Sequence, residues 1–197
     1  MPVAINPRTL RGPWQSGFAL DVHTVSSTFL GHNSFGHAEF ETVRSPLGDL
    51  LYRLKNGGDQ SAVAPIVEAI VGFLRTWKPT VDVLVPVPPS NRARRQQPVI
   101  TIATQLSVAT GIPVSETCVR KIRSTAQLKD VFDYSKRTEI LKDAFAVNED
   151  EVRGRRLLIL DDLYRSGATV GTIAQLLSGA GAAAVYLLTL TQTRKLS

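Results

Sequence analysis

At positions 157–169 the chain reads Leu-Leu-Ile-Leu-Asp-Asp-Leu-Tyr-Arg-Ser-Gly-Ala-Thr. Four apolar residues are typical of a buried strand, and the two carboxylates that follow stand at its carboxyl end, where open α/β sheets bind ligands. The Ser-Gly-Ala-Thr segment predicts a loop that enters a helix at about 168–180. This strand–loop–helix unit therefore indicates an α/β fold with a ligand site at one edge of its sheet.

The loop has the chemistry of a phosphate site. The first N–H groups of a helix lack partners within it and lie at the positive end of its dipole, and Gly167 lets a phosphate approach the backbone. Hydroxyls from Ser166 and Thr169 can donate to the same phosphate. The carboxylates of Asp161 and Asp162 can accept hydrogen bonds from vicinal sugar hydroxyls. A ribose phosphate fits both halves, and the alternative is a helix cap beside two solvated acids.

The flanking sequence alternates strand patterns with helical patterns. We predict strands at 81–87, 119–122, 144–147, 156–160 and 183–190, and helices at 61–77 and 98–110. A further helix has Pro46 at its first position and ends at the turn 56–59. The polar stretch 123–142 carries a further helix from residue 135, and 148–155 is a polar connector. Such alternation implies a mainly parallel, twisted sheet with flanking helices and right-handed crossovers.

Residues 1–44 follow a different pattern. Residues 1–17 are rich in Pro, Gly and Arg, and the alternation over 18–22 predicts a strand. A turn at 30–34 and an extended piece at 39–43 complete a β-hairpin or small meander. We therefore divide the chain into an arm with a small β-rich hood, 1–44, and an α/β domain, 45–197. Three scattered histidines, His23, His32 and His37, lack the flanking ligands typical of a metal site.

Composition limits the classes of function. The hydrophobic fraction of 43% is that of an ordinary globular protein. A net charge of +6 favours anionic partners, either a phosphorylated metabolite or nucleic acid such as single-stranded DNA. The single cysteine, Cys118, excludes an intramolecular disulfide and a Cys-based zinc site. Without a secretion signal or a long apolar run, we expect a cytoplasmic protein with no membrane partner.

A second candidate segment reads Leu-Val-Pro-Val-Pro-Pro-Ser-Asn-Arg-Ala-Arg-Arg at 84–95. A buried strand here breaks into a turn that prolines fix, and three arginines follow. These cations can meet a pyrophosphate; the alternative is a rigid surface turn with a solvated basic face. The candidate pyrophosphate-binding residues are Val87, Pro88, Pro89, Arg92, Arg94, Arg95 and Lys121.

The segment 157–169 resembles the phosphoribosyl pyrophosphate (PRPP) motif of type I phosphoribosyltransferases. That motif has four apolar residues, two acids, two further residues and then Thr-Thr-Gly-x-Thr. Arg165 and Ser166 replace its first two threonines. The resemblance implies that Asp161 and Asp162 hold the ribose hydroxyls, and that residues 165–169, including Ala168, hold the 5′-phosphate.

The order of motifs over roughly 45–194 is similar to that of the competence-protein F (ComF) family of phosphoribosyltransferase-like proteins. The Pro-Val-Pro turn, the segment 45–59 with its Leu-Leu-Tyr-Arg-Leu-Lys-Asn-Gly-Gly-Asp, and the charged segment 120–127 carry this similarity. Two features differ. The usual Arg-Gly-Phe-Asn-Gln is replaced by Arg-Arg-Gln-Gln-Pro at 94–98, and the N-terminal four-cysteine zinc ribbon is absent.

The resemblance implies transfer of the 5-phosphoribosyl group from PRPP to an unidentified acceptor, with release of pyrophosphate. Mg²⁺ is implied as cofactor, reached by Asp161 and Asp162 directly or through water. The segment 123–142 suits a lid that closes over the substrate, so that Lys121, Arg123 and Lys129 contact pyrophosphate from above; the alternative is a solvated polar loop. The candidate catalytic residues are Asp161, Asp162 and Arg123. The alternative is a non-catalytic PRPP sensor, or a partner of DNA-processing machinery as in competence. Homodimers are common among such folds.

Overall fold

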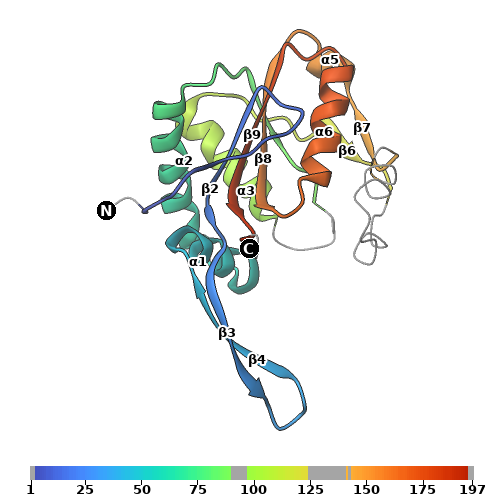
Figure 1. Ribbon diagram of the computed structural model, residues 1–197. Coiled ribbons are helices and arrows are strands. Elements are labelled where there is room, and N and C mark those ends of the chain that lie inside the picture. The colour runs from blue at the N-terminus through green and yellow to red at the C-terminus, as the bar shows by residue number, and fades with distance from the viewer. Residues whose placement is uncertain (1–2, 90–96, 124–140, 142, 195–197) are drawn as a thin grey trace.

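The structure of the chain is a computed structural model that describes residues 3–89, 97–123, 141 and 143–194 (Figure 1). Its centre is a five-stranded sheet in the order β1-β2-β9-β8-β5. These strands are β1 (Arg8–Thr9), β2 (Ser16–Val22), β9 (Ala184–Gln192), β8 (Arg156–Tyr164) and β5 (Val83–Pro86). All pairs are parallel except β1 with β2. The predicted α/β fold with a mainly parallel sheet is confirmed.

Helices cover both faces of the sheet. The helices are α1 (Pro46–Tyr52), α2 (Val63–Trp77), α3 (Pro98–Thr110), the short α5 (Glu149–Val152) and α6 (Ala168–Gly179). Side chains alternate along β8, so Leu157 and Ile159 belong to the core that contains α6. Leu158 and Leu160 belong to the opposite core, which contains α1, α2 and α3. Figure 1 shows α2 and α6 on opposite sides of the sheet.

The strand predicted at 18–22 belongs to the central sheet and not to an N-terminal hairpin. It is part of β2, which pairs with β9 in parallel, with Phe18 opposite Leu188. Ala19 and Leu20 are fully buried there. Trp14 anchors the preceding arm, because its Nε1 donates to the Leu10 carbonyl at 2.8 Å. Local alternation predicts a strand but does not identify its neighbour.

The division into two domains at residue 44 stays a prediction.

A two-stranded hairpin extends beyond the central sheet (Figure 1). It consists of β3 (Thr24–His32) and β4 (Ala38–Arg44), which pair antiparallel. The turn lies after His32, later than the sequence predicts, because Asn33 Oδ1 accepts hydrogen bonds from the N–H groups of Phe35 and His37. In the described residues no group of three or more His, Cys, Asp or Glu is placed to hold a metal ion.

The helix predicted to begin at Pro46 does so, but its last turn is not α-helical. After α1 the chain forms a π-helical turn, η1 (Arg53–Gly57), and then a 3-10 turn, η2 (Gln60–Ala62), that leads into α2. Asp59 fixes the connection: its carboxylate accepts from the Ser61 N–H and pairs with Arg53 at 2.5 Å. The turn η1 carries Lys55, which reaches the edge of the sheet.

Two short strands, β6 (Val119–Lys121) and β7 (Phe145–Val147), pair antiparallel close to their predicted positions. The polar connector predicted at 148–155 contains the short helix α5. The helix predicted from residue 135 lies outside the described residues. In the described part of the chain, no helix is long and apolar enough to cross a membrane.

Candidate functional site

The two acids stand where one strand leaves the sheet. The last pair between β5 and β8 joins Pro86 to Leu160, and the Val87 N–H donates to the Leu160 carbonyl at 2.8 Å. The strand β8 was predicted to end at Leu160. In the structure β8 continues to Tyr164, because β9 continues beside it. Asp161 and Asp162 therefore have a neighbouring strand on one side and an opening on the other.

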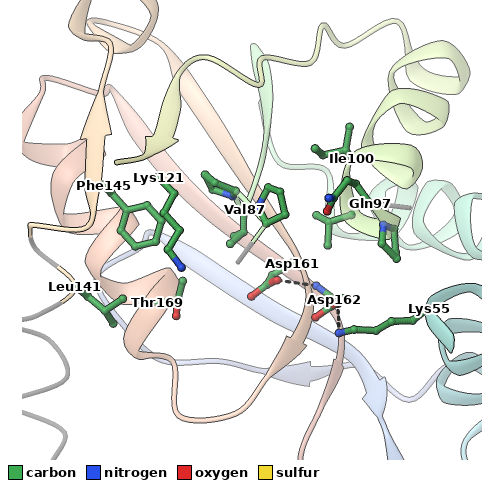
Figure 2. Close-up of a pocket in the computed structure, with 14 residues that line it drawn as sticks. Lys55, Val87, Gln97, Ile100, Lys121, Leu141, Phe145, Asp161, Asp162 and Thr169 are labelled. Carbon is green, nitrogen blue, oxygen red and sulfur yellow. Dashed lines mark hydrogen bonds and ion pairs between the residues drawn. The ribbon is translucent and has the colours of Figure 1, made fainter. Parts of the chain in front are cut away.

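A pocket of about 250 Å³ occupies this opening (Figure 2). Residues from five separated parts of the chain line it: Lys55, Val87, Pro88, Pro89, Gln97, Pro98, Val99, Ile100, Lys121, Leu141, Phe145, Asp161, Asp162 and Thr169. The structure thus brings seven of the candidate residues together: Val87, Pro88, Pro89, Lys121, Asp161, Asp162 and Thr169.

The pocket has two halves because successive side chains of a strand point to opposite faces. Asp161 continues the row of Leu157 and Ile159, and Asp162 continues the row of Leu158 and Leu160. In Figure 2 the two carboxylates point to opposite sides. We define the Asp161 half as Asp161, Lys121, Leu141, Phe145 and Thr169. We define the Asp162 half as Asp162, Lys55, Gln97 and Ile100.

Lys55 forms an ion pair with Asp162 across the mouth of the Asp162 half. Its Nζ lies 2.5 Å from Asp162 Oδ2, and the two side chains are 34% and 17% exposed. The Asp162 carbonyl accepts from Thr191 Oγ1 at 3.1 Å, which fixes the backbone of β8 at this residue. No local signal in the sequence marks Lys55 as a site residue, because it lies 107 positions from its partner in a segment interpreted as a helix end.

Asp161 is held differently. Its Oδ1 accepts from the Asp162 N–H at 2.9 Å. Burial raises the pKa of Asp161 above its ordinary value, and the negative charge of Asp162 raises it further. The neighbouring acids therefore differ in their environments: one carboxyl is driven towards its neutral form, and the other faces an ammonium group.

The predicted phosphate loop leads into α6. Gly167 is the N-cap residue with φ of +76°, and it contributes no side-chain cap. A Cβ on Gly167 would stand 2.4 Å from Tyr164 Oη, so both the backbone angle and the space require glycine. Of the loop residues, Thr169 lines the pocket, Ala168 is buried, and Arg165 and Ser166 are exposed outside its lining.

The remaining predicted cations are distributed unevenly. Lys121 lies in the Asp161 half, where burial lowers its pKa. Arg123 does not line the pocket; its side chain is 70% exposed and lies 3.5 Å from Asp143 Oδ2. A catalytic role for Arg123 stays a prediction. Arg92, Arg94, Arg95 and Lys129 lie outside the described residues.

Either acid can supply a carboxylate oxygen to a magnesium ion that a phosphorylated ligand also coordinates. Mg²⁺ is commonly held by one or two carboxylates together with phosphate oxygens and water. Asp161 and Asp162 offer two carboxylates in one pocket, and the described residues add no third acid, histidine or cysteine. The donor set therefore suits a shared ion and not a cage formed by the protein alone.

No family model matches the sequence, and no curated protein does. Among solved structures, the fold is similar to adenine phosphoribosyltransferase from Leishmania donovani, with a TM-score of 0.50 and 11% identity over 95% of this chain and 86% of that one. Adenine phosphoribosyltransferase from Saccharomyces cerevisiae has a TM-score of 0.46 and 12% identity, over 84% of this chain and 85% of that one. Glutamine PRPP amidotransferase from B. subtilis has a TM-score of 0.45 and 18% identity, over 75% of this chain and 28% of that one. The first of these comparisons shows that this chain shares the α/β fold of adenine phosphoribosyltransferase.

Proposed function

We propose that the protein is a phosphoribosyltransferase, which binds PRPP with Mg²⁺ and transfers its 5-phosphoribosyl group to an acceptor. The observation that carries the proposal is the meeting of Asp161, Asp162 and Thr169 with the proline turn in one pocket. The similarity of fold is consistent with this function. The pocket supplies the specific argument, because function depends on the site and not on the fold.

We expect each part of the pocket to hold one part of the ligand. The carboxyl groups of Asp161 and Asp162 bind the ribose hydroxyls, one from each side of β8. The start of α6 and residues 165–169 bind the 5′-phosphate. The turn at residues 87–89, with Lys121, binds pyrophosphate, and Arg92, Arg94 and Arg95 are proposed to assist it.

In the proposed reaction, the bond from ribose C1 to the pyrophosphate oxygen breaks, and its electron pair leaves with pyrophosphate. A bond forms from C1 to the attacking atom of the acceptor, which loses its proton to solvent. Positive charge develops on the ribose ring, so the chain contributes by orienting ligands, stabilising the leaving group and excluding water. Bound Mg²⁺ neutralises charge on the pyrophosphate.

Isothermal titration of PRPP, with and without Mg²⁺, tests the proposal. We expect Mg²⁺-dependent binding, and a loss of affinity of about 100-fold in the double variant Asp161→Asn plus Asp162→Asn. In that variant Asp162 no longer makes charge-assisted hydrogen bonds, and Asp161 loses one acceptor oxygen. Asp150→Asn, on exposed α5, is the control and keeps wild-type affinity. An absence of PRPP binding by the wild type contradicts the proposal.

Two further results decide between this function and its alternatives. Slow hydrolysis of bound PRPP that no tested acceptor accelerates supports a non-catalytic sensor. Micromolar binding of single-stranded DNA with a steep salt dependence, and no PRPP binding, supports a DNA-associated protein.

A further inference from the structure

We propose that Lys55 directly binds the pyrophosphate group of the ligand in the Asp162 half of the pocket. This inference rests on the proposed function, and it assigns a residue that neither the loop motif nor the proline turn contains. The ion pair with Asp162 shows that η1 delivers a cation to this half, at the point where β5 has left the sheet.

The ammonium group of Lys55 retains binding capacity. An ammonium group has three N–H donors, and one of them points to Asp162 Oδ2. Between described residues, the ion pair with Asp162 is the one ion pair that Lys55 forms. Its side chain is 34% exposed and lines the pocket. Two donors can therefore serve a ligand while the contact with Asp162 persists.

The chemistry of this half favours an anion. Lys55 balances the charge of Asp162. Gln97 is the N-cap residue of the 13-residue helix α3, and Ile100 lies in its first turn; both line the same half. The start of a helix carries a partial positive charge. The sum of these charges is positive, so a phosphoryl or carboxylate oxygen is favoured over a cation.

The position identifies which anionic group this is. The start of α6, the proposed site of the 5′-phosphate, adjoins Thr169 in the Asp161 half. A ribose whose hydroxyls meet both acids extends from that half to the Asp162 half. Its C1 substituent, the pyrophosphate, then points towards the turn at residues 87–89, where Figure 2 shows Val87 between Lys121 and Gln97. Lys121 therefore approaches the pyrophosphate from the Asp161 half, and Lys55 approaches it from the Asp162 half.

Titrations of three probes test this inference: Mg²⁺–pyrophosphate, ribose 5-phosphate and Mg²⁺–PRPP. We expect Lys55→Met to weaken pyrophosphate and PRPP binding about 10-fold or more, and to leave ribose 5-phosphate within about 3-fold. Lys55→Arg restores most of the affinity because it keeps the charge. Lys78→Met removes an exposed cation from the end of α2 and is the matched control. Thermal melting establishes that each variant is folded.

A second variant separates direct contact from charge neutralisation. In Lys55→Met the charge of Asp162 is unbalanced, and Asp162→Asn added to it removes that charge. We expect pyrophosphate binding to stay weak in the double variant. Recovery to the wild-type affinity means that Lys55 only neutralises Asp162, and it overturns the inference.

Other outcomes are equally decisive. Equal weakening of ribose 5-phosphate and pyrophosphate shows that Lys55 only positions Asp162, and it overturns the inference. An unchanged affinity of Lys55→Met for pyrophosphate also overturns the inference. That result is expected if Lys55 binds an anionic group of the acceptor and not the pyrophosphate. If the wild type binds PRPP while Lys55→Met has no effect, the inference fails and the proposed function stands. If pyrophosphate binding depends on Lys55 but PRPP does not bind, the pyrophosphate site at Lys55 stands and the proposed function fails.

Discussion

Asp161 and Asp162 are adjacent in sequence, yet their carboxyl groups point to opposite faces of the central sheet (Figure 2). The alternation of side chains along β8 causes this separation. Because β5 ends at Pro86, both carboxyl groups open into one pocket. A ligand that binds both acids must therefore span the edge of β8.

The raised pKa of Asp161 predicts how stability depends on pH. The folded state retains the proton to a higher pH than the unfolded state, so the free energy of unfolding falls as pH rises above the ordinary value of 3.8. Asp161→Asn removes this dependence. We therefore expect the free energy of unfolding of the variant, relative to that of the wild type, to rise by about 1–3 kcal/mol when the pH is raised from about 4 to about 8. Urea unfolding at both pH values measures it, and parallel pH profiles contradict the prediction.

Gly167→Ala tests the loop that precedes α6. The change places a Cβ at a positive φ and against Tyr164, so we expect a loss of stability of about 1–2 kcal/mol and a loss of PRPP affinity of at least about 10-fold. Gly111→Ala is the control, because Gly111 has a similar φ of +74° at the end of α3 but nothing within 4 Å. It loses stability without losing affinity. Equal affinity in both variants contradicts the role of the loop.

Asp82 fixes the start of β8. It accepts from Arg156 Nε at 2.9 Å and from the Arg156 N–H at 2.8 Å, and these bonds lower its pKa to about 2. The stabilisation is present above the ordinary pKa of 3.8 and is lost as pH falls through about 2. We expect Asp82→Asn to melt a few degrees below the wild type at pH 7. The difference should narrow towards pH 2, as calorimetry would show; a constant difference refutes this explanation.

The hairpin of β3 and β4 should unfold locally. Phe29 and Phe40 lie opposite each other with ring centroids 5.4 Å apart, although both are more than half exposed. Such a pair contributes about 0.2–1 kcal/mol. We therefore expect Phe40→Ala to speed amide exchange across the hairpin by up to about 5-fold, with β8 and β9 unchanged. Phe35→Ala, at the 83% exposed tip, is the control. Faster exchange throughout the sheet contradicts a local role.

The sequence predicted most of the α/β core because its signals are local. The apolar run at Leu157–Leu160 and the stripe along α2 are decided by neighbours a few positions away. The start of α6 was also predicted, since a glycine before a helix marks a loop that enters it.

The features that the sequence did not predict depend on distant partners. The place of β2 beside β9 depends on pairing between residues such as Phe18 and Leu188, and its alternating pattern is compatible with any neighbour. The continuation of β8 past Leu160 depends on β9 in the same way. Lys55 enters the pocket because the turn η1 brings its ammonium group to Asp162, which lies 107 positions further along the chain, and no spacing in the sequence predicts that contact.

The central claim is that the pocket at the end of β8 holds a ribose that carries a 5′-phosphate and a pyrophosphate. A crystal structure with PRPP and Mg²⁺ tests it most directly. We predict density for the 5′-phosphate at Gly167 and Thr169, with the ribose hydroxyls between Asp161 and Asp162. Density elsewhere, or an empty pocket at saturating ligand, would contradict the account.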